Sequence, residues 1–213
     1  MRKFWKWALI VLGGLIGSIA LLIGAMWLSE DVRYGVIYAV MERVDLNPAI
    51  APARLARQVE ALHRTALIDE NGRPFDWHAS PHAIVWINEW ANWCVPCRME
   101  FAAMAALRER VGRDRLRIVL FSQPQYWDAD KRLAKKLGLD FELVTAKDPA
   151  PQDMAAINLA KRPDDFLLPE HSFLRADGAG IEAMQTVRDW DSTAWETIIR
   201  RWQADGAHRQ SPR

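Results

Sequence analysis

The stretch Trp90-Ala91-Asn92-Trp93-Cys94-Val95-Pro96-Cys97-Arg98-Met99-Glu100 holds the only two cysteines among the 213 residues of the chain. The run before it, Ala83 to Ile87, is β-branched and aromatic and predicts a short buried strand. A helix is predicted after it, because apolar side chains recur every three or four positions at Phe101, Met104, Leu107 and Val111. The polar side of that helix is expected to contain Arg98, Glu100, Glu109 and Arg110. Cys94 therefore falls at a strand-to-helix junction.

This junction suits thiol chemistry. The unpaired N–H groups and the positive dipole end of a helix stabilise a thiolate, which is the nucleophilic form of cysteine. Pro96 fits the first helical turn, where a missing N–H has no consequence. Cys97 is expected one turn deeper and less exposed. We therefore assign Cys94 as the nucleophile that attacks a partner disulfide and Cys97 as the thiol that resolves the mixed disulfide.

Other uses of a Cys-x-x-Cys pair need weighing. A zinc site requires two further ligands, and only His78 and His82, in a predicted loop before the cysteines, have metal-like spacing. A purely structural disulfide is disfavoured, because such a small ring constrains little unfolded-chain entropy. Copper(I) delivery stays open, since two thiolates suffice for copper(I) and Met99 lies nearby. Apart from the redox-active disulfide, we expect no cofactor and no resident metal.

The segment from Trp86 to Glu100 resembles the active-site segment of the TlpA-like thioredoxin family, the membrane-anchored thiol-disulfide oxidoreductases of the bacterial periplasm. The resemblance covers residues 65–203. It implies an α/β thioredoxin fold, with a central mixed sheet flanked by helices. It also implies a reductase that a membrane electron donor of the DsbD/CcdA type recharges. The implied substrates are periplasmic protein disulfides, such as those of apocytochrome c or of a metallo-assembly factor.

The direction of electron flow stays open at this point. Val95-Pro96 resembles neither the Gly-Pro of strong cytosolic reductants nor the Pro-His of strong oxidants. Reduction potentials in such proteins differ by about 150 mV between the extremes. A thiol oxidant or isomerase is therefore the alternative enzyme, beside the copper(I) carrier.

The resemblance also implies roles for residues around the cysteines. Trp93 resembles the family's flat apolar platform for a partner chain. Pro169 is the position carried over for a proline with a cis peptide bond that faces the disulfide, although three residues rather than the usual two separate it from Phe173. Asn88 stands six residues before Cys94, where thioredoxins carry a buried aspartate.

Glu89 replaces an aromatic residue usual in the family. As a strand neighbour it should face the opposite side of the sheet from Asn88. It is either a partly buried, hydrogen-bonded structural acid or, in a sharper hypothesis, an acid of raised pKa that relays a proton to Cys97. His171, two residues after Pro169, could also approach the disulfide, but a surface position is expected.

The N-terminal region predicts a membrane anchor. Arg2, Lys3 and Lys6 precede Ala8 to Leu28, which is 21 residues long and carries no charge. At about 1.5 Å per residue such a helix spans the roughly 30 Å hydrocarbon core, and it exceeds the about 7–15 apolar residues of a cleaved signal peptide. Basic residues before the span favour a cytoplasmic N-terminus. We expect a single-pass anchor in the bacterial inner membrane, with the catalytic domain in the periplasm.

The remaining chain alternates strands and helices, which favours an α/β layer fold with parallel strand pairs. The elements expected are a hairpin in 65–77, strands at 115–122, 141–145 and 181–187, and helices at 127–137, 154–160 and from Thr193 onward. The domains expected are the anchor (1–28), a juxtamembrane connecting segment (29–64), the thioredoxin-like domain (65–203) and a polar tail (204–213). The connecting segment, which ends in a short helix near Arg64, either docks on the domain or spaces the active site from the bilayer. Nothing points to nucleic acid, because the net charge is only +1 and no basic run follows the N-terminus.

Overall fold

The computed structural model describes residues 11–21, 23–24, 50–76, 84–158, 168–185 and 187–210. The chain divides into two units, Met1–Asp45 and Leu46–Arg213. Residues 11–21 are helical, but the described part of the chain contains no helix with both the length and the apolar character needed to cross a bilayer. Much of the predicted anchor, including its basic flank, lies outside the described residues, as do most of the connecting segment and the two loop histidines, His78 and His82. The anchor therefore stays a prediction.

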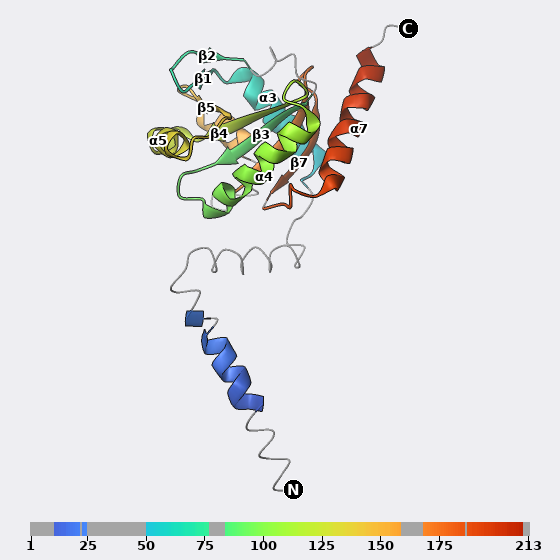
Figure 1. The fold of residues 1–213 in the computed structure, drawn as a ribbon. Coiled ribbons are helices and arrows are strands. Elements are labelled where there is room, and N and C mark those ends of the chain that lie inside the picture. Colours follow the sequence, from blue (N-terminus) through green and yellow to red (C-terminus); the bar gives the residue numbers. More distant parts are fainter. Residues whose placement is uncertain are drawn as a thin grey trace, which may run out of the picture. The chain divides into compact units, whose positions relative to one another are not determined.

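A mixed sheet of seven strands forms the centre of the second unit (Figure 1). Its strands are β1 (Leu67–Asp69), β2 (Pro74–Phe75), β3 (Ile84–Trp90), β4 (Leu116–Ser122), β5 (Glu142–Ala146), β6 (Glu170–Arg175) and β7 (Gly180–Gln185). They lie in the order β2-β1-β5-β4-β3-β6-β7. The pairs β3–β4 and β4–β5 are parallel and the others antiparallel. The predicted hairpin and the predicted edge strand are both present.

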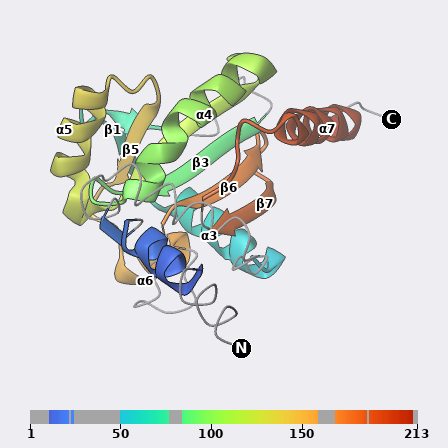
Figure 2. The same cartoon turned by 60° about the horizontal axis from the view of Figure 1, so that its bottom comes forward.

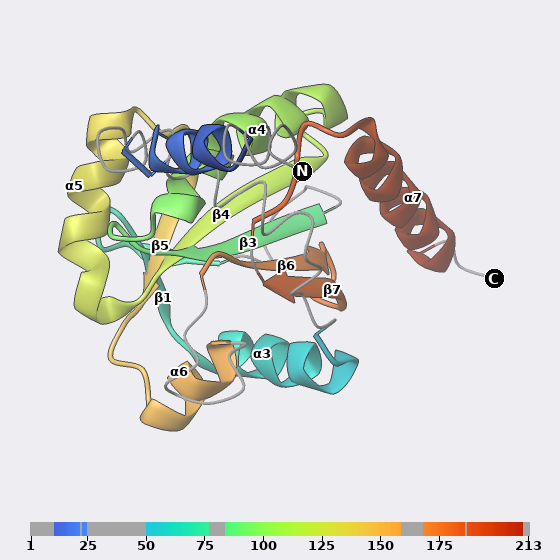
Figure 3. The same ribbon diagram turned by 90° about the horizontal axis from the view of Figure 1, so that it is seen from below.

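Helices cover both faces of the sheet, as Figures 2 and 3 show. The helices are α3 (Pro52–Arg64), α4 (Val95–Val111), α5 (Trp127–Leu137), α6 (Pro151–Ile157) and α7 (Thr193–Gln210), with a short 3₁₀ turn η1 (Pro124–Tyr126). The apolar faces of α4 and α7 pack on one side of the sheet, and those of α3 and α6 pack on the other. The α/β layer arrangement predicted from the sequence is confirmed.

Strand β3 lies between two hydrophobic cores, and all seven of its residues are buried. Trp86 and Trp90 belong to the core under α4 and α7, whereas Val85 and Ile87 belong to the core under α3 and α6. Burial of one such side chain contributes about 1.5–3 kcal/mol. A strand buried on both faces is a rigid support for the loop that follows it, and that loop contains Cys94.

Two segment boundaries differ from expectation. Leu55 and Leu62 of α3 are buried in the second core, and the amide of Gln58 donates to the carbonyl of Ile157 at 2.7 Å. Helix α3 therefore packs with the sheet, whereas the predicted domain starts only after it, at residue 65. At the other end, α7 continues to Gln210 and so includes most of the predicted polar tail.

Candidate redox site

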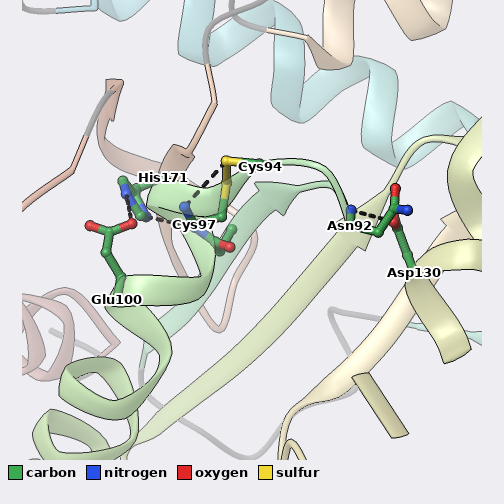
Figure 4. Close-up of a disulfide and its surroundings, with 7 residues drawn as sticks. Asn92, Cys94, Cys97, Glu100, Asp130 and His171 are labelled. Atoms are coloured by element: carbon green, nitrogen blue, oxygen red, sulfur yellow. Dashed lines mark hydrogen bonds and ion pairs between the residues drawn. A yellow bond between two sulfur atoms is a disulfide. The ribbon is translucent and has the colours of Figure 1, made fainter. Parts of the chain in front are cut away.

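The two cysteines form a disulfide at the start of α4 (Figure 4). Cys94 is the N-cap residue of this helix, and its Sγ accepts a hydrogen bond from the backbone N–H of Cys97 at 3.2 Å. Pro96 lies in the first turn, as predicted. Cys94 is 2% exposed and Cys97 is 0% exposed, so the accessible edge of the pair belongs to Cys94. In the reduced chain, the dipole and free N–H groups at this helix end favour a thiolate on Cys94.

A buried aspartate holds the loop between β3 and the disulfide. The backbone N–H of Asn92 donates to Oδ1 of Asp130 at 2.6 Å, which ties the loop to α5 (Figure 4). Burial raises the pKa of Asp130 to about 6, although the hydrogen bonds from Ser122 and from Asn92 act in the opposite direction. The loop before Cys94 is therefore held by the hydrogen bond to α5 as well as by its own backbone turn.

Pro169 has the predicted cis peptide bond, between Leu168 and Pro169. It is buried and directly precedes β6, which pairs antiparallel with β3. Because Glu170 lies opposite Glu89, this register places Pro169 beside the end of β3, where the Cys94 loop begins. The structure thus brings Pro169 and the redox loop to the same end of the sheet, where β3 ends and β6 begins.

Trp93 provides an exposed apolar surface beside the disulfide. Its side chain is 48% exposed, and its ring meets that of Tyr126 edge to face at a centroid distance of 5.7 Å. Met99 is 40% exposed. Exposed aromatic side chains that a neighbour holds in place are suited to contact with a partner chain.

Glu100 is buried, although the helical pattern placed it on the polar side of α4. It is 2% exposed, and its Oε1 accepts hydrogen bonds from Nε1 of Trp190 at 2.6 Å and from the backbone N–H of Arg188 at 2.7 Å. The expectation was wrong because the segment before α7 folds over α4 and supplies the donors that a buried carboxylate needs.

His171 is also buried, so its expected surface position was wrong. Its Nδ1 lies 3.2 Å from Nε1 of Trp86 and 2.9 Å from Nδ2 of Asn88. An indole N–H can only donate, so Nδ1 accepts and the ring hydrogen of neutral His171 resides on Nε2. That Nε2 lies 3.5 Å from Oε2 of Glu100 (Figure 4). The network joins α4, one turn after Cys97, to the strand that follows Pro169.

Asn88 and Glu89 face opposite sides of the sheet, as predicted. Glu89 is 3% exposed, and its Oε1 accepts a hydrogen bond from Nε2 of Gln123 at 2.7 Å. Burial raises the pKa of Glu89 to about 7, while contacts with Gln123 and Glu170 act to lower it. A titrating acid is therefore present, but on the face away from Asn88 and α4. The proton relay from Glu89 to Cys97 stays a prediction.

Sequence reasoning missed three polar residues of this site: Glu100, Asp130 and His171. Asp130 occupies an apolar-face position of α5, because Trp127, Asp130 and Ala134 follow one another at helical spacing. A charged residue in such a stripe is a usable signal of a buried, partnered group. The other two could not be found this way, since their partners come from distant segments.

Within the described residues, no group of three or more histidine, cysteine, aspartate or glutamate side chains is arranged to hold a metal ion. His78 and His82 lie outside that part of the chain. The copper(I) alternative rests on Cys94, Cys97 and the exposed Met99, and it stays an alternative.

The chain matches no family profile and no curated protein. Among solved structures it is similar to a candidate thiol:disulfide interchange protein DsbE from Chlorobium tepidum, with a TM-score of 0.52 and 18% identity over 65% of this chain and 92% of that one. It is also similar to a candidate electron transfer protein from Aquifex aeolicus VF5, with a TM-score of 0.52 and 14% identity over 70% and 95% of the two chains.

A thioredoxin-like protein from Porphyromonas gingivalis gives a TM-score of 0.50 and 16% identity, over 67% of this chain and 91% of that one. Identities this low establish a shared fold and leave the activity to be argued from the site. The second unit of the chain therefore has a thioredoxin-like α/β fold, with its Cys94–Cys97 pair at the start of α4.

Proposed function

We propose that the chain is a membrane-anchored thiol-disulfide oxidoreductase that reduces protein disulfides in the bacterial periplasm. The observation that carries this proposal is the disulfide of the N-capping Cys94 with Cys97, beside the buried Pro169 at the same end of the sheet. The N-cap position favours a thiolate on Cys94. The backbone before Pro169 can pair with a substrate strand.

The reaction is a two-step exchange. The Cys94 thiolate attacks one sulfur of the substrate disulfide, forming a mixed disulfide and releasing the other substrate sulfur as a thiolate, which takes up a proton. The Cys97 thiol then loses its proton and attacks Sγ of Cys94, which releases the second substrate thiol. The protein ends as the Cys94–Cys97 disulfide, and two electrons have passed to the substrate. A membrane dithiol donor of the DsbD/CcdA type restores the reduced form.

The substrate class follows from the resemblance and from the surface around the disulfide. The resemblance implies periplasmic protein disulfides such as those of apocytochrome c or of a metallo-assembly factor. The exposed Trp93 ring beside Cys94 gives such a substrate an apolar contact. The inner-membrane location rests on the uncharged stretch from Ala8 to Leu28 and its basic flank.

The decisive experiment is the equilibrium reduction potential of the Cys94–Cys97 pair, measured on the full chain in mild detergent against dithiothreitol and glutathione buffers. A value near or below about −220 mV supports a reductase, and one near −120 mV makes the protein an oxidant. Absence of a reversible dithiol–disulfide transition would exclude redox activity. Cys97→Ser should trap the mixed disulfide with a substrate, whereas Cys94→Ser should trap none. Tight copper(I) binding by the reduced chain that is lost in Cys94→Ser would instead support the carrier.

A further inference from the structure

The first turn of α4 carries an arginine on the same side of the helix as Cys94. The backbone N–H of Arg98 donates to the carbonyl of Cys94 at 3.4 Å, so the two residues are helical neighbours four positions apart. Residues at this spacing share one face of a helix, and side chains lean toward the N-terminus of their helix. The side chain of Arg98 therefore leans toward Cys94, the cysteine with the accessible edge.

The guanidinium of Arg98 has no partner in the described part of the chain. Its Nε is buried without an acceptor, and its terminal nitrogens form no hydrogen bond or ion pair with a described residue. The other two arginines of α4 differ in this respect. Arg108 lies 3.0 Å from a carboxylate oxygen of Asp140, and Arg110 lies 3.7 Å from one of Asp191. The N–H donors of Arg98 are therefore available to a group from another molecule.

Three carboxylates on the α4 and α5 side of the redox loop each have another partner. Glu100 is buried and accepts two hydrogen bonds. Asp130 is buried and accepts a hydrogen bond from the loop itself. The exposed Asp128 of α5 lies 3.1 Å from Nζ of Lys131. None of them neutralises Arg98, so a positive charge without a counter-ion among the described residues lies beside the disulfide.

The side chains next to Arg98 in the chain suit contact with a protein. Trp93 is 48% exposed and Met99 is 40% exposed, on either side of the two cysteines. Aromatic side chains, methionine and arginine are enriched where protein partners meet. A protein segment that brings a disulfide to Cys94 therefore meets an apolar surface and one unpaired cation.

A carboxylate is the group that matches a guanidinium best, because its two oxygens accept two parallel N–H donors. Resting on the proposed function, we propose that Arg98 is a specificity-determining residue that binds an aspartate or glutamate next to the attacked cysteine of the substrate. The preferred substrates are then disulfides in acidic protein segments. Arg98 contacts the substrate and takes no part in the exchange of electrons or protons.

A cation beside a thiol has a second possible effect, which the test must separate from the first. Arg98 could stabilise the thiolate of Cys94, and that effect would accelerate the reaction with every disulfide by the same factor. Binding of a substrate carboxylate accelerates only the reaction with acidic disulfides. The ratio of two rate constants therefore distinguishes the two roles.

The test uses the full, reduced chain in an uncharged detergent and three disulfides. Two are acetylated and amidated peptides, each closed by one Cys-x-x-Cys disulfide, which differ only in having aspartate or asparagine on both sides of that ring. The third is bis(2-hydroxyethyl) disulfide, which is uncharged and has no side chains. Single-turnover rate constants are measured at about pH 7 in about 0.01 M and about 1 M salt, where the screening length is about 30 Å and about 3 Å.

The measured quantity is the rate constant for the aspartate peptide divided by that for the asparagine peptide. Arg98→Gln should lower this ratio about threefold to fivefold at low salt, the size expected for one partly exposed ion pair. Differences in the intrinsic reactivity of the peptides cancel, because every protein reacts with the same two. Arg98→Lys keeps the charge but not the paired donors, so it should keep part of the preference. At high salt the difference between the wild-type chain and Arg98→Gln should disappear.

Arg132→Gln is the matched control, because it removes the same charge from an exposed position on α5. It should keep the wild-type ratio at both salt concentrations. The rate constant for bis(2-hydroxyethyl) disulfide should change less in Arg98→Gln than the rate constant for the aspartate peptide.

An unchanged ratio in Arg98→Gln overturns the proposal, as does an equal loss in Arg132→Gln, which would assign the preference to net charge. Equal slowing of all three disulfides in Arg98→Gln also overturns it, in favour of an effect on the Cys94 thiolate. If the wild-type chain reacts with none of the disulfides, the proposed function itself fails. If the small disulfide reacts and the ratio does not respond to Arg98, the proposed function stands and this inference alone falls.

Discussion

The two faces of the sheet beside the disulfide each bury a glutamate, and the two sites differ in what surrounds the carboxyl. On the α4 face, Glu100 accepts two hydrogen bonds, from Nε1 of Trp190 and from the backbone N–H of Arg188, and its Oε2 lies 3.5 Å from Nε2 of His171. On the α3 face, Glu89 meets one amide and a second carboxyl. Hydrogen-bond donors satisfy the oxygens of a buried carboxyl, whereas burial with few donors raises its pKa, as at Glu89. Glu100, one helical turn after Cys97, and Glu89, near the end of β3, are therefore in different chemical environments.

The largest expected effect tests the donor-rich side. Glu100→Ala leaves the Trp190 indole and the Arg188 N–H without a buried acceptor and removes the carboxylate that faces His171, so the free energy of unfolding should fall by about 3–5 kcal/mol. Glu100→Gln keeps one acceptor oxygen and should lose about 1–2 kcal/mol. Urea unfolding at neutral pH measures both.

Glu109→Ala is the matched control on the same helix, because its exposed salt bridge with Arg113 contributes at most about 1 kcal/mol. Equal losses for Glu100→Ala and Glu109→Ala would mean that water replaces the missing acceptor, and the contrast between the two faces would disappear.

The next effect tests the carboxyl pair through the pH dependence of stability. Burial raises the pKa of Glu89 from 4.5 to about 7, so the folded chain binds more protons than the unfolded chain between these values. The resulting stabilisation is fully present below about pH 4.5 and is lost as the pH rises through about 7, with a total of about 3 kcal/mol. Glu89→Gln should remove this part of the slope.

Urea unfolding of both proteins from pH 5 to pH 8 measures the difference, and the same-sign contribution of Asp130 cancels between them. Parallel curves for the wild-type chain and Glu89→Gln would show that the carboxyl does not titrate in this range.

The smallest effect concerns Asp130, a third buried carboxyl, whose Oδ1 accepts a backbone N–H and whose Oδ2 has no hydrogen-bond partner among the described residues. Asp130→Ala should reduce the free energy of unfolding by about 1–2 kcal/mol, since the Asn92 N–H loses its acceptor. Amide hydrogen exchange at Asn92 should accelerate, because the redox loop is released from α5. Asp130→Asn keeps an acceptor and should preserve slow exchange at Asn92. Rapid exchange in both variants would mean that the charge of Asp130, rather than its acceptor oxygen, orders the loop.

Local patterns predicted the parts of the site that depend on neighbours in the chain. The Cys-x-x-Cys spacing, Pro96 and the strand before them placed Cys94 at a helix start, and the period of two along β3 placed Asn88 and Glu89 on opposite faces. Patterns failed where long-range packing decides burial. Glu100 was assigned to the polar side because its donors come from residues 188 and 190, which no periodicity links to α4.

The sequence by itself determined the redox pair, the α/β alternation and the proline that proved to be cis, because these depend on residue type, spacing and short-range backbone geometry. The tertiary structure alone decided which polar residues are buried together. Glu89 and Glu170 become neighbours only through the β3–β6 register, and Glu100 and His171 only through the packing of α4 on β6. The cost of burying a charge depends on such distant partners, so the chemistry of these acids appears only when the chain is folded.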